Sequence, residues 1–314
     1  MKRRGFLQTL VALGTGGLSG AAGAEAKGKA AYDPGARFEI DVQDVPFRRN
    51  AAGRELLARV YRPVVKAGNA GPFPVLLDLH GGAWVRKDRT ANEPMDRAVA
   101  ASGVLVVAID MTLAGEAPYP AAVQDASYGV RWLKSRTREW QGEPASLGVL
   151  GSSSGGHVAE LIAMRPNDER YNAIPFKGEG LDSGVAYLVT RSPISDPYAR
   201  WQRAEKLQRK ALIEASRAFF RPWQTIHEAN PQEILDRREA VELRPLLVMQ
   251  GALDDNVLPA VQEKFSASYN AAGGECRLEV FEGCEHEWVA KPGPQTDRAY
   301  EMVKAFIARQ LRSG

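Results

Sequence analysis

Apolar residues in this chain gather in short continuous runs, and between the runs they recur every three or four positions. A short apolar run bounded by turn residues is typical of a parallel strand that is buried on both faces. The spaced segments are typical of amphipathic helices that cover a sheet. Their alternation predicts an α/β fold, with a mostly parallel central sheet and helices on both faces. The predicted buried strands are residues 74–82, 104–110, 146–151, 185–189 and 245–251.

Other strands and a last helix are expected outside this set. Residues 37–47 and 55–64 alternate between apolar and polar positions and are joined by a short polar segment, which predicts an antiparallel hairpin at one edge. The segment RLEVF at 277–281 is predicted as a further strand. The chain then closes with a predicted helix that has Tyr300, Val303, Ile307 and Leu311 on one face.

Residues 197–235 interrupt this alternation, because they are much longer than a single crossover between two strands. Their position suits a small helical lid over the carboxyl edge of the sheet, where open α/β folds bind ligands. We expect packed helical structure with its basic residues on a solvated side. The apolar positions are Tyr198, Trp201, Ala204, Leu207, Leu212 and Ala215, and the basic positions are Arg200, Arg203, Lys206 and Lys210.

The first 24 residues have the layout of a bacterial export signal: three basic residues, a moderately apolar stretch and small residues at the end. The segment RRGFL resembles the twin-arginine class. An A-x-A site predicts cleavage after Ala24, with cleavage after Ala26 as the alternative. A disordered cytoplasmic tail is the competing interpretation. We therefore expect an exported protein, periplasmic or secreted, whose residues 25–314 form a single domain.

The charge balance of the chain argues against nucleic acid and anionic lipid as partners. The whole chain carries 41 basic and 38 acidic residues, and the leader holds three of the basic residues and none of the acidic ones, which leaves 38 of each. A protein without net charge has no general attraction for nucleic acid or for anionic lipid. The leader is also too short and too weakly apolar for a permanent membrane span. Neither nucleic acid nor stable membrane insertion is expected.

Cysteine chemistry and metal binding are poorly supported. The chain has two cysteines, Cys276 and Cys284. The two cysteines are eight residue steps apart, which in an extended chain spans roughly 26 Å, whereas a disulfide requires Cα atoms within about 7 Å. We therefore expect no bond between them. No group of Cys or His residues has the spacing of metal ligands, so no metal site is expected.

The run GSSSGGH at 151–157 contains the main chemical signal. A G-x-S-x-G segment between a strand and a helix is the nucleophile turn of α/β-hydrolases, where small flanking residues allow a tight turn that presents the central serine to solvent. A frame on Ser152 would require glycine in place of Leu150, and a frame on Ser154 would require glycine in place of Ser152. Only Ser153 has glycine two positions away on both sides. A flexible Gly/Ser linker is the alternative interpretation.

The backbone N–H of Ser154, at the start of the helix that follows the serine turn, is expected to face a developing oxyanion. A second donor is expected in the loop after an earlier strand. HGGAW at 80–84 lies at the end of such a strand, and its glycines let backbone amides approach a substrate closely. Ala83 stands where a third glycine would give the loop more freedom, but it keeps the amide. His80 and His157 belong to these two motifs, and we expect them to hydrogen-bond the loops in which they lie.

The base and the acid are expected later in the chain. His286 follows the last predicted strand, at the same edge of the sheet as the serine turn, and it is therefore the candidate base. The orienting acid should lie between serine and histidine in sequence. Asp254 follows a strand by a short turn and is the preferred candidate, while Asp255 and Asp196 stay open. One of the pair at 254 and 255 is also expected to cap the helix that starts near Leu258.

Three segments, HGGAW, GSSSGGHVA and LAGEAPYPAAVQDASYGVRWLK, resemble the acetylesterase and hormone-sensitive-lipase-like branch of the α/β-hydrolases, a carboxylesterase group. The resemblance covers residues 73–165 and 245–290, and it departs from the family pattern at Ala83 and Ser154. It implies an α/β-hydrolase fold and serine-dependent hydrolysis of small carboxylic esters without a cofactor. It also implies Ser153 as nucleophile, His286 as base and Asp254 as orienting acid, with the amides of Gly82, Ala83 and Ser154 as the oxyanion hole.

Three other functions stay open. The enzyme could hydrolyse amides or formamides, as arylformamidase-like members of the fold do, or acetyl or feruloyl esters of polysaccharides. A catalytically silent binding protein of the same fold is the interpretation from outside the enzymes. Three tryptophans, Trp84, Trp223 and Trp288, are candidates either for the pocket wall or for core and lid packing.

Overall fold

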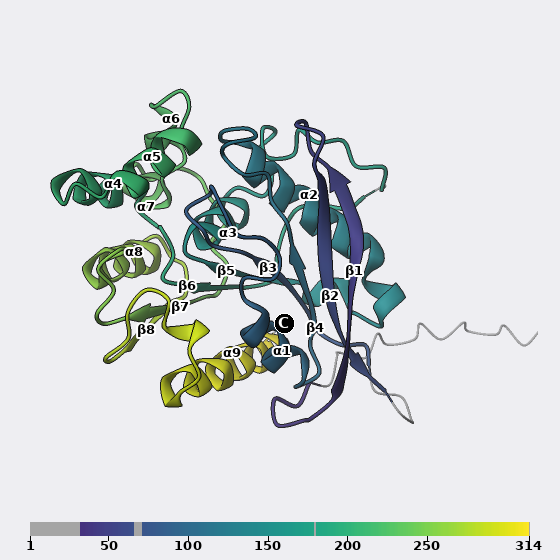
Figure 1. The fold of residues 1–314 in the computed structure, drawn as a ribbon. Helices are drawn as coiled ribbons and strands as arrows, with labels where there is room; N and C mark the ends of the chain where they lie inside the picture. The colour runs from purple at the N-terminus through teal and green to yellow at the C-terminus, as the bar shows by residue number, and fades with distance from the viewer. Residues whose placement is uncertain (1–31, 66–70, 179, 314) are drawn as a thin grey trace, which may run out of the picture.

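The computed structural model describes residues 32–65, 71–178 and 180–313, and these residues are organised around one eight-stranded sheet (Figure 1). The α/β prediction is confirmed. The expected leader, residues 1–24, lies outside the described residues, and the extent of the domain at 25–314 stays a prediction.

The strands follow the spatial order β1-β2-β4-β3-β5-β6-β7-β8. Both β1–β2 and β2–β4 pair antiparallel, and every later pair is parallel, so the predicted hairpin does form one edge. The sixth strand begins at Leu188, three residues later than predicted. Val185 and Tyr187 are buried, which made them resemble strand residues in the sequence, but they belong to the segment that precedes the strand. The strands are β1 Glu39–Arg49, β2 Glu55–Val64, β3 Val75–Leu79, β4 Leu105–Ile109, β5 Gly148–Ser152, β6 Leu188–Arg191, β7 Leu246–Gly251 and β8 Cys276–Phe281.

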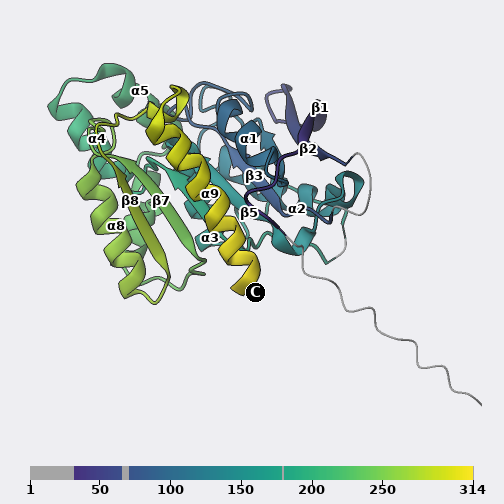
Figure 2. The ribbon, with the colours of Figure 1, turned by 90° about the horizontal axis from the view of Figure 1, so that it is seen from below.

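Helices cover both faces of the sheet, as the unbroken apolar strands require. Leu77 and Leu79 of β3 pack into one hydrophobic cluster, whereas Leu76, which points to the other face of the strand, packs into the other. Figure 2 shows α9 crossing one face near α1, with α2, α3 and α8 on the opposite side. The helices that cover the sheet are α1 Glu93–Ala100, α2 Ala121–Arg136, α3 Ser154–Met164, α8 Pro259–Ala271 and α9 Pro294–Ser313, with short 3₁₀ turns at Thr137–Trp140, Pro144–Ser146 and Trp288–Ala290.

The insertion after β6 forms four short helices rather than one continuous pattern: α4 Pro197–Lys206, α5 Lys210–Phe219, α6 Thr225–Glu228 and α7 Pro231–Asp236. Two details of the prediction are wrong. Leu207 is 44% exposed, because α4 ends before it and the chain turns at Gln208, which has a positive φ of 52°. Arg200 is buried rather than solvated, because its guanidinium donates to the side chain of Asn256.

The insertion contacts the body of the protein at the carboxyl edge of the sheet. The Phe219 ring of α5 stacks on Trp84, which follows β3, with ring centroids 4.8 Å apart. Arg203 and Arg209 both donate to the backbone carbonyl of Asp255, which follows β7, at 3.1 and 3.0 Å. The insertion is thereby anchored to two of the loops that end at this edge.

A buried polar cluster fixes α3 to the neighbouring elements. Ser195 Oγ lies 2.9 Å from Glu160 Oε1 and 3.0 Å from Gln262 Oε1. The amide of Gln262 is oriented by its donation to the carbonyl of Pro193, so its oxygen faces the serine. One hydroxyl proton cannot serve two acceptors, so Glu160 must supply the second proton. Burial agrees with this, since it raises the pKa of Glu160 to about 8.

This cluster predicts how stability depends on pH. The folded pKa of Glu160 lies above its ordinary value of 4.5, so its contribution to stability is complete below that value and is lost as the pH rises toward about 8. Glu160→Gln keeps the shape and offers an N–H to Ser195 without titrating. We therefore expect the variant to gain stability relative to wild type as the pH rises. The difference in free energy of unfolding, variant minus wild type, should be larger near pH 8 than near pH 5 by at least about 1 kcal/mol. Urea unfolding at both pH values measures this; the same difference at both would mean that Glu160 is ionised in the fold.

Candidate active site

Four loops at the carboxyl edge of the parallel strands bring the candidate residues together. The HGGAW loop follows β3, Ser153 follows β5, Asp254 follows β7 and His286 follows β8. Parallel strands end at the same edge of a sheet, so residues far apart in sequence meet there. The sheet order places β5 next to β3, which brings the serine turn close to the HGGAW loop.

Ser153 occupies a sharp turn with φ 53° and ψ −115°. A non-glycine residue in this region is strained, which is the known geometry of a nucleophile turn. The flanking glycines are required by close contacts: a Cβ on Gly155 would lie 2.1 Å from the carbonyl oxygen of Leu79, and one on Gly151 would lie 2.5 Å from that of Gly155. The frame inferred from the sequence therefore has a steric basis.

The imidazole of His286 connects the serine to a carboxylate. Its Nε2 lies 2.9 Å from Ser153 Oγ, and its Nδ1 lies 2.7 Å from Asp254 Oδ2. A carboxylate can only accept, so Nδ1 carries the proton and Nε2 is free to accept from the serine hydroxyl. This is the tautomer that a general base for a serine nucleophile requires.

Asp254 is buried and fully hydrogen-bonded, unlike its neighbour. Its Oδ1 accepts from the backbone amides of Asn256 and Val257 at 3.0 and 2.9 Å, and its Oδ2 also accepts from Gln250 Nε2 at 3.1 Å. Burial alone would raise the pKa of the Asp254 carboxyl, but the hydrogen bond and charge of His286 outweigh it and hold the pKa below its ordinary value. The group therefore stays ionised at neutral pH.

The other acidic candidates lie elsewhere. Asp255 pairs at the surface with Arg209, and Asp196 caps α4 by accepting from the amide of Ala199. The predicted cap on α8 is wrong: the helix begins after Leu258 without a side-chain cap, because Asp254 binds the amides of its own turn instead.

Two contacts that the sequence did not suggest hold the His286 loop. Arg191, at the end of β6, donates from Nη1 to the carbonyl of His286 at 2.6 Å. Lys87, just after the HGGAW segment, pairs with both carboxylate oxygens of Glu287 at 3.0 and 3.1 Å. An arginine that ends a buried strand (LVTR) was the available signal, since a buried guanidinium needs an acceptor.

The HGGAW loop presents unpaired amides near the serine. Within the described part of the chain, the N–H groups of Gly82 and Ala83 donate no hydrogen bond. Gly82 has φ 109°, and a Cβ there would lie 2.1 Å from the carbonyl oxygen of Arg86, so the position demands glycine. The amide of Ser154 belongs to the first turn of α3, where backbone N–H groups lack helical partners.

Trp84 connects this loop to α3 and to the insertion. Its backbone N–H donates to Ser154 Oγ at 3.1 Å, and its indole N–H donates to His157 Nδ1 at 3.2 Å. Burial lowers the pKa of His157 to about 4, so the ring is neutral and its Nε2–H donates to the carbonyl of Ala229 at 2.7 Å. His80 Nδ1 lies 2.8 Å from the carbonyl oxygen of Gly81. His80 thus bonds within its own loop, as expected, whereas His157 bonds Trp84 of the HGGAW loop and Ala229 of the insertion rather than the segment in which it lies.

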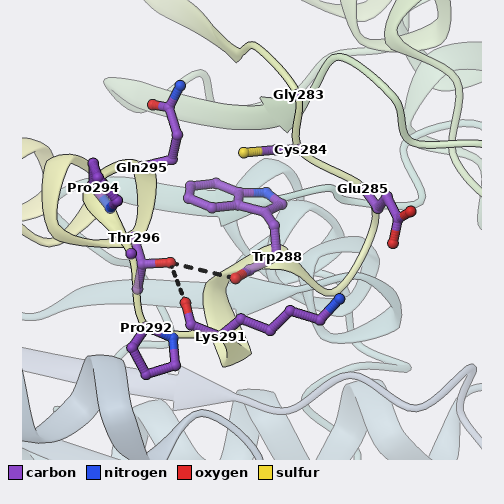
Figure 3. A pocket seen from close by; sticks show the side chains of 10 residues that line it. Gly283, Cys284, Glu285, Trp288, Lys291, Pro292, Pro294, Gln295 and Thr296 are labelled. Carbon is purple, nitrogen blue, oxygen red and sulfur yellow. Dashed lines mark hydrogen bonds between the residues drawn. The ribbon is translucent and has the colours of Figure 1, made fainter.

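Two cavities near these loops differ in size and place. A void of about 10 Å³ touches Gly81, Trp84 and Ser154. A cavity of about 330 Å³ is lined by residues 283–285, Trp288 and residues 291–296 (Figure 3). Trp288 also stacks on Phe281 of the core, and His286 does not line this cavity. The tryptophan is therefore both a wall and a packing residue, but its cavity is not formed around the serine.

Trp223, the third tryptophan candidate, lies in the insertion, between α5 and α6. Trp223 packs on Trp201 within the insertion, at 4.8 Å between centroids. Cys276 and Cys284 are both free and buried. Over residues 32–65, 71–178 and 180–313, no three His, Cys, Asp or Glu side chains form a group that could hold a metal ion. Among the same residues, no helix combines the length and the apolar character needed to cross a membrane.

Solved structures share this fold. An esterase of Thermogutta terrifontis with propionate bound aligns over 87% of this chain and 94% of its own, with 19% identity and a TM-score of 0.67. A truncated carbohydrate esterase from gut microbiota aligns over 88% of this chain and 98% of its own, with 15% identity and a TM-score of 0.66. At these identities the likeness shows the fold.

Curated relatives match parts of the sequence. Carboxylesterase NlhH of Mycobacterium tuberculosis is 34% identical over 115 residues, which are 36% of this chain and 35% of that protein. Esterase LipC of the same organism is 25% identical over 255 residues, 77% of this chain and 60% of that protein. The chain thus spans about a third to three fifths of these relatives. A model of the alpha/beta hydrolase fold family matches residues 76–290, from β3 through the His286 loop. The chain therefore belongs to the alpha/beta hydrolase fold family.

Proposed function

We propose that this protein is a serine-dependent hydrolase of small carboxylic esters. The observation that carries the proposal is the continuous hydrogen-bonded series Ser153–His286–Asp254 beside unpaired backbone amides. The similarity to carboxylesterase NlhH and esterase LipC supports an ester as the substrate. No cofactor takes part in the proposed reaction.

The geometry suggests the following steps. Ser153 Oγ attacks the ester carbonyl carbon while its proton passes to His286 Nε2, and the amides of Gly82, Ala83 and Ser154 receive the negative carbonyl oxygen. His286 then gives the proton to the leaving alcohol, and an acyl-serine remains. A water molecule, deprotonated by the same nitrogen, attacks the acyl group, and collapse of the second intermediate releases the acid and restores the serine. Asp254 stabilises the imidazolium in both halves.

A short acyl group is the preferred substrate in this proposal. The void beside the HGGAW loop measures about 10 Å³, room for about one water molecule. Trp84, Phe219 and Phe220 fill the space above α3 with packed rings, and each is 5% exposed or less. Extending the acyl chain would require these rings to move.

Ser153→Ala is the first test of the reaction. Without the hydroxyl no acyl-enzyme can form, so kcat/KM for p-nitrophenyl acetate should fall by about 10⁴-fold or more, with unchanged circular dichroism. The matched control is Ser152→Ala, whose hydroxyl lies 3.4 Å from Arg191 Nε and away from the imidazole; it should stay within about tenfold of wild type. Retained activity in Ser153→Ala, or an equal loss in both variants, would contradict the assignment.

Asp254→Asn and Asp255→Asn form a second matched pair. The amide at position 254 can donate to His286 Nδ1 and so favours the wrong tautomer, which should reduce kcat on the order of 10³-fold or more. Asp255 makes a surface pair with Arg209, so its variant should lose less than about threefold. Initial rates on p-nitrophenyl acetate decide between them, and a larger loss at 255 would move the acid to that residue.

We further propose that the protein is exported through a twin-arginine signal in residues 1–24. Expression of the full chain in a bacterium with a periplasm should yield a periplasmic form that begins at Glu25, or at Lys27 if cleavage follows Ala26. Replacing Arg3 and Arg4 together by lysine should leave the uncleaved chain in the cytoplasm. Fractionation and intact-mass measurement test this, and an uncleaved cytoplasmic wild-type protein would refute it.

A further inference from the structure

Arg200 is a buried cation whose hydrogen bonds are incomplete. The residue is 5% exposed, and Nε donates to Asn256 Oδ1 at 3.0 Å. Its Nη2 is buried and has no acceptor within the described parts of the chain. Burial lowers the pKa of Arg200 to about 10, which still leaves the group charged at neutral pH. Leaving a buried donor of a charged group unpaired is costly, so an acceptor is missing here.

Among the carboxylates of residues 32–65, 71–178 and 180–313, none supplies that acceptor. The negative charge of Asp254 acts to raise the pKa of Arg200, but the two carboxylate oxygens of Asp254 already receive four hydrogen bonds, from His286, Gln250 and two backbone amides. The carboxylate of Asp255 pairs with Arg209. The contacts of the guanidinium are thus with a neutral amide, Asn256, and with the aromatic face of Trp84.

The place of this cation matters for the proposed reaction. Its central carbon lies 5.7 Å from the centroid of the Trp84 ring, and Trp84 belongs to the loop of the unpaired amides. Its other neighbour, Asn256, belongs to the turn of Asp254. Arg200 belongs to α4 of the insertion (Figure 1), and through these two contacts it touches two of the loops that form the site.

We propose that Arg200 binds a carboxylate carried by the substrate, so that the preferred substrates are anionic esters. This inference rests on the proposed ester hydrolysis and specifies its substrate class. A carboxylate beside Trp84 accepts from Nη2 and completes the charge pair that the protein leaves open. A charge-assisted hydrogen bond of this kind contributes about 1.5–3 kcal/mol, which is about 10- to 100-fold in affinity.

Binding to the Ser153→Ala protein tests the proposal without turnover. Calorimetry compares monomethyl succinate, which bears the carboxylate on the acyl side, with neutral dimethyl succinate. A second pair, acetoxyacetate and its methyl ester, places the carboxylate on the alcohol side. We expect the anion of at least one pair to bind about tenfold tighter or more than its neutral partner, and the pair that shows the preference identifies the side.

Variants made in the same Ser153→Ala background assign the effect. Arg200→Gln should abolish the preference, and Arg200→Lys should keep part of it, because the charge remains while the planar donor fork is lost. Lys206→Gln removes the same charge from an exposed position on α4 and should leave the preference intact. If Arg200→Gln does not fold, as judged by its melting curve, Arg200→Lys against Lys206→Gln gives the same comparison.

Three results would overturn the inference: equal binding of charged and neutral partners in both pairs, a preference that survives Arg200→Gln, or an equal loss in Lys206→Gln. A purely structural role for Arg200, through Asn256 and Asp254, would lower the affinity for charged and neutral esters alike and leave the ratio of the two affinities unchanged. Failure of the proposed function looks different, because wild-type protein would then hydrolyse neither p-nitrophenyl acetate nor the anionic esters.

Discussion

The two hydrogen bonds of the His286 imidazole are the contacts on which the site depends. They join Ser153 and Asp254, which lie 133 and 32 residues away along the chain, through one ring. Such contacts form only if β5, β7 and β8 end at the same edge in the right order, which the parallel sheet ensures. The backbone of His286 is also held in place, because Arg191 donates a hydrogen bond to its carbonyl oxygen. The fold supplies the position, and the local turns supply the orientation.

Buried polar groups, rather than the apolar core alone, set the geometry around this ring. Arg191, Trp84 and Glu160 each tie a loop or helix of the site to a neighbouring element. A buried polar group without its partner is destabilising, so each of these contacts favours one arrangement of the loops over others. Among the described residues, several buried side chains have an unpartnered polar atom, Glu160 Oε2 and Arg200 Nη2 among them, but Arg200 is a buried cation that contacts two loops of the site. That position is why we connect it with a ligand.

Much of the fold followed from the sequence because it depends on local patterns. Continuous apolar runs predicted β3, β4, β5 and β7, and the spacing of glycines around Ser153 predicted the serine turn. The chain order of serine, acid and histidine brought the same three residues together that the structure joins, although their chemical roles stay predictions. Separating Asp254 from Asp255 required coordinates, because both follow the same strand and only their partners, His286 for Asp254 and Arg209 for Asp255, distinguish them.

The parts that sequence could not predict depend on partners far along the chain. Arg200 was expected on a solvated face because its helix has other basic residues. It is buried instead, and its guanidinium donates a hydrogen bond to Asn256, 56 residues away along the chain. The role of Arg191 depends on a carbonyl 95 residues away. Leu207 follows an apolar spacing that a turn at Gln208 interrupts. In each case a tertiary contact or a backbone reversal overrode the local pattern.

The central claim is that the hydroxyl of Ser153 is a nucleophile activated by His286. Labelling of the folded protein with a fluorophosphonate probe, followed by peptide mapping, tests it most directly, because the probe reacts covalently with an activated serine. The account predicts a single modified peptide that contains Ser153, with no labelling after Ser153→Ala or His286→Ala. A folded wild-type protein that stays unlabelled, or a label on Ser152 or Ser154 instead, would contradict it.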